Sequence, residues 1–149
     1  MKTKIISRLL ILGLVFVLGS AITQVRGQGV VTIHSTGDVV RGETGSFVVN
    51  MSRMCYGFMG VNFSVSGTAI PGVDYLPLVS PALVQMIPCH YPQQCTETCR
   101  PGVGVIPFKT LPDPRALFFP QAYSVVVTLK AGPGYTIGEP SSAQMMINP

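Results

Sequence analysis

The stretch from Val61 to Tyr75 reads Val-Asn-Phe-Ser-Val-Ser-Gly-Thr-Ala-Ile-Pro-Gly-Val-Asp-Tyr. Its first residues alternate between apolar side chains and Asn or Ser, which is the two-residue period of a strand with one buried face. Pro71-Gly72 then predicts a tight turn, because proline presets φ at the first central position and glycine tolerates a positive φ at the second. We therefore predict a strand over 61–66 that leads into an ordered loop carrying Asp74.

Six further segments have the composition of strands, and no window shows a sustained helical period. Prolines are spread through the second half of the chain and would interrupt most helices. Seven short strands joined by turn residues predict an all-β chain folded as two packed sheets. The other six predicted strands are 30–33, 45–52, a broken strand over 76–87, 103–109, 123–130 and 143–147.

The motif from Gly67 to Tyr75, with Gly134-Tyr-Thr-Ile-Gly-Glu-Pro-Ser-Ser-Ala143 near the end of the chain, resembles the Calx-beta domain. That resemblance implies an immunoglobulin-like, seven-stranded antiparallel β-sandwich over residues 28–149. It also implies a non-enzymatic binding, adhesion or structural module whose partner is a protein or a component of the extracellular matrix or cell surface. The alternative implied function is a calcium-binding module whose stability or partner binding depends on the metal.

Residues 1–27 have the pattern of a secretory signal peptide. Lys2, Lys4 and Arg8 precede ten apolar or glycine positions, from Leu9 to Leu18, and small residues follow. Cleavage before Gln28 is preferred to cleavage after Ala21. No second apolar run reaches membrane length, so we expect no membrane span after cleavage and an exported protein that is secreted, periplasmic or held at the cell surface.

The basic character of the whole chain comes from this leader. Four of the ten basic residues precede residue 28, whereas all six acidic residues follow it. The remaining chain has as many acidic as basic side chains and no basic cluster, which argues against binding to nucleic acid.

Four cysteines in an exported chain predict two disulfides, and three pairings are open from their number alone. In an immunoglobulin-like sheet the second strand pairs with the fifth, which favours Cys55 with Cys99 and leaves Cys89 with Cys95. A zinc site built from Cys89, His90, Cys95 and Cys99 is a less favoured alternative, because its spacing is not that of a standard zinc motif.

The resemblance implies a calcium tip, at which Asp74 matches the Asp of the Gly-x-Asp-Tyr motif while Asp113 and Glu43 lie in the neighbouring loops. Calcium takes six to eight oxygen ligands, and three carboxylates supply few of them. Arg41 and Arg115 are expected at the same tip. We therefore expect no cofactor, with weak calcium binding by Asp74, Asp113 and Glu43 as the alternative, and we hypothesise that the two guanidinium groups pair with Asp74 and Asp113 in place of a metal.

Catalysis requires a nucleophile beside an oriented base. His34 and His90 are the two histidines of the chain. Adjacent residues of an extended chain point to opposite sides, so His90 is poorly placed to activate Cys89. We therefore predict that the protein is not an enzyme, with a small hydrolase as the alternative.

Overall fold

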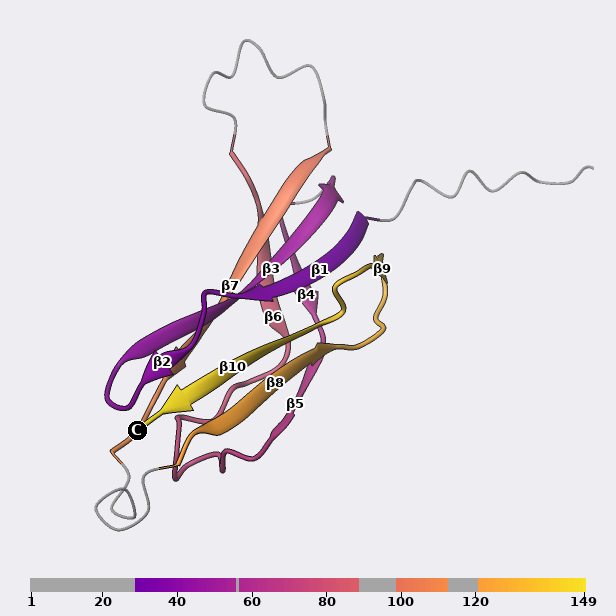
Figure 1. Ribbon diagram of the computed structural model, residues 1–149. Coiled ribbons are helices and arrows are strands. Elements are labelled where there is room, and N and C mark those ends of the chain that lie inside the picture. Colours follow the sequence, from indigo (N-terminus) through magenta and orange to yellow (C-terminus); the bar gives the residue numbers. More distant parts are fainter. Residues whose placement is uncertain (1–28, 56, 89–98, 113–120) are drawn as a thin grey trace, which may run out of the picture.

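The computed structural model describes residues 29–55, 57–88, 99–112 and 121–149, which form two β-sheets in a sandwich-like arrangement (Figure 1). The larger sheet has the strand order β4, β6, β7, β3, β1 and β9, with bounds Phe58–Val61, Ala82–Met86, Arg100–Lys109, Thr44–Met54, Gly29–Ser35 and Tyr135–Ile137. The smaller sheet has the order β2, β10, β8 and β5, with bounds Val39–Val40, Ser142–Asn148, Tyr123–Leu129 and Phe63–Gly67. The all-β class and the two packed sheets are as predicted. Within the described ranges no helix is long and apolar enough to cross a membrane.

The described residues form ten strands, whereas the sequence predicted seven. β2 and β9 contain two and three residues, which is too short to show a period. Each is held by parallel pairing with a longer strand, β2 with β10 and β9 with β1, so the pairing is not antiparallel throughout. The predicted strand 76–87 is a strand only over Ala82–Met86, because Pro77 and Pro81 have no N–H to donate to a ladder.

The predicted strand 61–66 is part of a longer run that changes sheet at Asn62. Val61 pairs with β6 of the larger sheet, and Phe63 pairs with β8 of the smaller sheet. The backbone N–H of Asn62 donates to the hydroxyl of Tyr135 at 3.0 Å, outside either ladder. Val61 and Phe63 are both buried. One continuous run therefore links the two sheets along one side of the sandwich.

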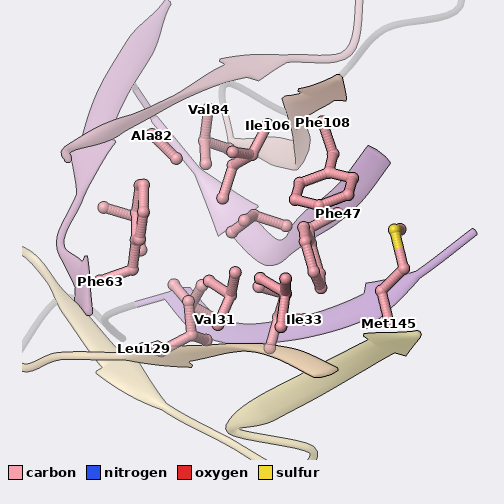
Figure 2. Packing of buried hydrophobic residues seen from close by; sticks show 14 of the residues in the cluster. Val31, Ile33, Phe47, Phe63, Ala82, Val84, Ile106, Phe108, Leu129 and Met145 are labelled. Atoms are coloured by element: carbon pink, nitrogen blue, oxygen red, sulfur yellow. The ribbon is translucent and has the colours of Figure 1, made fainter. Parts of the chain in front are cut away.

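The core lies between the two sheets and is predominantly aliphatic (Figure 2). Phe47 of β3 and Phe108 of β7 meet edge to face, with ring centroids 6.0 Å apart. Tyr75 packs against Phe108 at 5.1 Å. Because Tyr75 directly follows Asp74, this aromatic group joins the core to the loop that the sequence singled out.

Candidate functional site

The loop after β5 contains the predicted turn at Pro71-Gly72. The N–H of Val73 donates to the carbonyl of Ile70 at 3.1 Å, and Gly72 has φ of 79°. Both features are those of a turn with proline and glycine at its central positions. The chain then continues inward, so that Asp74 is 0 % exposed.

The buried carboxylate of Asp74 has hydrogen-bond donors on both oxygens. Its Oδ2 accepts the N–H of Ile70 at 2.7 Å, within its own loop. Its Oδ1 accepts Nη2 of Arg41 at 3.0 Å, and this contact is an ion pair. The Arg41 side chain is only 9 % exposed, so the pair is largely removed from water. The hypothesis that a guanidinium group pairs with Asp74 is thus confirmed, with Arg41 as the partner, while Arg115 and Asp113 lie outside the described residues.

Arg41 also contacts three other segments at this end of the sandwich. Its Nη1 donates to the carbonyl of Leu111 at 3.3 Å, and its guanidinium carbon lies 5.2 Å from the ring centroid of Tyr123. Its backbone N–H donates to the carbonyl of Asn148 at 3.0 Å. We call Arg41, Asp74, Leu111 and Tyr123 the Arg41 tip. One side chain therefore ties together loops that are far apart in sequence.

Glu43, the third predicted calcium ligand, lies in the same turn region as Arg41. Its Oε2 accepts the N–H of Val40 at 3.5 Å, and its backbone carbonyl accepts the hydroxyl of Thr110 at 2.7 Å. Among the described residues no group of three or more His, Cys, Asp or Glu side chains is arranged to hold a metal ion. Because both oxygens of Asp74 already face donors, the described part of this tip does not fit a calcium site.

Tyr75 links the Arg41 tip to the core and is 2 % exposed. Its burial, and secondarily the negative charge of Asp74, raise the pKa of its phenol above the ordinary value of 10.0. Both effects disfavour the phenolate. The folded protein therefore holds Tyr75 in its neutral form at pH values at which an unfolded chain begins to ionise.

This raised pKa predicts a dependence of stability on alkaline pH. The contribution of Tyr75 is fully present below pH 10.0 and is lost as the pH rises through the folded-state pKa, because the unfolded chain releases the proton first. We expect the free energy of unfolding of Tyr75→Phe to fall less steeply above about pH 10 than that of the wild type. Urea unfolding at a series of pH values measures both slopes, and parallel curves would contradict the prediction.

The opposite end of the larger sheet carries the disulfide. Cys55 follows β3, Cys99 precedes β7, and the two are bonded with a Cα–Cα distance of 4.0 Å. β3 and β7 pair antiparallel, as the predicted pairing of the second and fifth strands requires. A disulfide sulfur is not a thiolate, so Cys99 is not available to the alternative zinc site. Cys89, His90 and Cys95 lie outside the described residues, as does the predicted bond between Cys89 and Cys95.

His34, on β1, is the histidine that the structure describes. Its Nδ1 lies 3.2 Å from the side-chain nitrogen of Asn50 on the neighbouring strand β3. His34 is exposed, and its contact with Asn50 runs between two neighbouring strands of the sheet. The contacts of His34 are those of a side chain on the outer surface of the sheet.

The two sheets differ in what their outer faces expose. On β5, β8 and β10 the positions between the buried ones are mainly hydroxyl and amide residues. On the larger sheet, by contrast, Phe58 is 71 % exposed, Leu83 64 % and Val105 57 %. Val105 lies opposite Val48 of β3, and the pairing of Val84 with Gly104 places Leu83 beside Val105. We call Phe58, Leu83, Val105 and Val48 the apolar face.

Sequence reasoning did not identify the apolar face. Val103 and Val105 alternate in β7 with Gly102 and Gly104, and it is the glycines that point inward. A Cβ on Gly102 would overlap the side chain of Met54, and one on Gly104 would lie 3.0 Å from Val84 Cγ2. The signal available in the sequence was this run of small residues at every second position, which indicates that neighbouring side chains fill the space.

Comparison of this chain with models of known protein families and with curated proteins finds no match.

Proposed function

We propose that this chain is an exported, non-enzymatic binding module of the immunoglobulin-like Calx-beta type, with a role in adhesion or in the structure of a surface or matrix. Export is supported by the leader pattern of residues 1–27 together with the Cys55–Cys99 disulfide, which suits an oxidising compartment. The Calx-beta type is supported by the motif around Asp74 and by its place in a loop of a two-sheet structure.

The observation that carries the binding role is the apolar face. An exposed group of large apolar side chains costs solubility, and such groups mark surfaces that become covered by partners. Phe58 adds an aromatic side chain, the kind that dominates binding energy at protein interfaces. The strands β4 and β6, which carry Phe58 and Leu83, bear no charged residue, so a partner need not desolvate an ion there.

The module acts without calcium in this proposal. Arg41 supplies the positive charge that a metal would otherwise bring to Asp74. The ion pair holds the loop around Asp74 against the ends of β7 and β8 whether or not calcium is present. Partner binding is accordingly expected to be the same in calcium and in EDTA.

A pull-down with variants of the mature protein tests the proposal. Residues 28–149 are used as bait against extracts of the envelope and surroundings of the producing organism. We expect the double variant Phe58→Ser and Leu83→Ser to capture about tenfold less of a specific partner than the wild type does. A buried aromatic anchor contributes about 2 kcal/mol or more to binding. Both side chains are exposed, so the fold should persist, and circular dichroism checks this.

Val40→Ser is the matched control, because Val40 is 47 % exposed on β2 of the smaller sheet. This variant should retain the partner as the wild type does. If the double variant captured the same partner equally well, or if capture required calcium, the proposal would be refuted.

A further inference from the structure

A cleft of about 570 Å³ adjoins the apolar face at Val105. One wall is the extended segment Leu76-Pro77-Leu78, which lies beside the end of β7. Val105 and Pro107 of β7 also line the cleft. The volume is within the range of sites that hold small molecules.

The lining of the cleft is mainly apolar, includes Phe108 and has a single charged residue. Lys109, the last residue of β7, is exposed, and its ammonium takes part in no ion pair among the described residues. Thr44 lies directly opposite Lys109 on β3 and, with Ser46, adds hydroxyl groups. No acidic side chain is among the described residues that line the cleft. The ligand that best complements this lining therefore has an anionic group attached to an apolar portion.

The backbone of the cleft is poorly suited to an added peptide strand. The carbonyl of Lys109 already accepts the N–H of Leu76 at 3.0 Å. Pro107 should face the same side of β7, since alternate residues of a strand direct their backbone groups the same way, and it has no N–H to donate. An extended polypeptide would find few ladder partners here. A ligand that needs only aliphatic contact and one cation suits the cleft better.

We propose that this cleft is a binding site for an aliphatic carboxylate, such as the anion of an unbranched fatty acid. In this proposal the carboxylate binds the Lys109 ammonium, on the side of the cleft that Thr44 and Ser46 of β3 also line, and the hydrocarbon chain packs against Leu76 and Val105. Burial of methylene groups supplies most of the affinity, at about 0.8 kcal/mol for each one removed from water. The positive charge of Lys109 favours an anionic head group over a cationic one. The site is separate from Phe58 and Leu83 and does not depend on the protein partner proposed above.

Isothermal titration calorimetry of the purified mature protein tests this site, with dodecanoate as the probe and dodecyltrimethylammonium as the ligand of matched chain length and opposite charge. We expect saturable binding of one dodecanoate at low salt and much weaker binding of the cation. Lys109→Gln should weaken dodecanoate binding by about two- to fivefold, the range of an exposed ion pair. Leu76→Asp, at a position 47 % exposed, should abolish it by placing a carboxylate in the wall.

Lys130→Gln is the control for Lys109, because Lys130 is an exposed lysine that does not line the cleft. The double variant Phe58→Ser and Leu83→Ser should still bind dodecanoate, which separates this site from the apolar face. Equal binding of the two amphiphiles, binding of many copies, or affinities unchanged by both Lys109→Gln and Leu76→Asp would each overturn the assignment.

Discussion

Replacing Arg41 by methionine is expected to lower the free energy of unfolding by about 3–5 kcal/mol, because it leaves a buried carboxylate without its counter-charge. Asp74 is 0 % exposed, and its Oδ1 lies 3.0 Å from Arg41 Nη2. The same substitution removes the hydrogen bond to the carbonyl of Leu111 and the cation beside the ring of Tyr123. Urea unfolding followed by far-UV circular dichroism measures the loss.

Two further variants separate the ion pair from the general effect of losing an arginine. Arg53→Met changes an exposed arginine of β3 and should alter the free energy of unfolding by less than about 0.5 kcal/mol. The double variant Arg41→Met with Asp74→Asn should be less destabilised than the sum of its single variants, since a neutral amide needs no counter-charge. An Arg41→Met protein within about 1 kcal/mol of the wild type would show that the pair is not a major source of stability.

Calcium provides an independent check of the same ion pair. With Arg41 in place, millimolar calcium should leave the melting temperature of the mature protein unchanged, because both oxygens of Asp74 already accept hydrogen bonds. A rise in melting temperature that EDTA reverses would contradict this and favour the calcium-binding alternative.

Replacing Cys55 and Cys99 together by alanine is expected to lower the free energy of unfolding by about 4 kcal/mol. The disulfide joins residues 44 positions apart, and the chain-entropy model assigns a stabilisation of about this size to a loop of that length. The bond joins the end of β3 to the start of β7, strands that already pair from Thr44 to Met54. The alanine variant should therefore keep its strand content while its urea midpoint falls.

Replacing Cys55 and Cys99 by alanine tests this one disulfide more specifically than a reducing agent does, because a reducing agent would also act on Cys89 and Cys95. Peptide mapping of the wild type without reduction should recover a fragment that links Cys55 to Cys99 and a second that links Cys89 to Cys95. A stability loss below about 1 kcal/mol, or a linkage of Cys55 to either of the other cysteines, would contradict the prediction.

Local sequence patterns predicted the features that depend on neighbouring residues. Pro71-Gly72 indicated a turn, and the hydrogen bond from Val73 to Ile70 is present. The alternation after Val61 indicated a strand with one buried face, and Val61 and Phe63 are buried. It gave no sign of the change of sheet at Asn62, where the backbone N–H donates to the hydroxyl of Tyr135, more than seventy residues away in the chain.

The Arg41 tip shows how far the motif alone could lead. The position of Asp74 in its loop was readable from Gly72 to Tyr75, and the shortage of acids around it indicated that a guanidinium would take the place of a metal. The contacts of Arg41 with Leu111 and Tyr123 depend on how segments far apart in the chain pack together, and no sequence pattern predicted them.

The sequence by itself determined the strand-rich class and the turn that carries Asp74, because both follow from local preference. The pairing of Cys55 with Cys99 was expected only through the resemblance to an immunoglobulin-like sheet, and the structure shows that bond. Only the tertiary structure decided which side of β7 faces outward. Apolar residues occupy both sets of alternating positions in β7. Val103 and Val105 belong to one set, and Ile106 and Phe108 belong to the other. Gly102 and Gly104 turn inward because Met54 and Val84 fill the space above them. That packing leaves Val105 on the surface, where it joins the apolar face to the cleft beside Lys109.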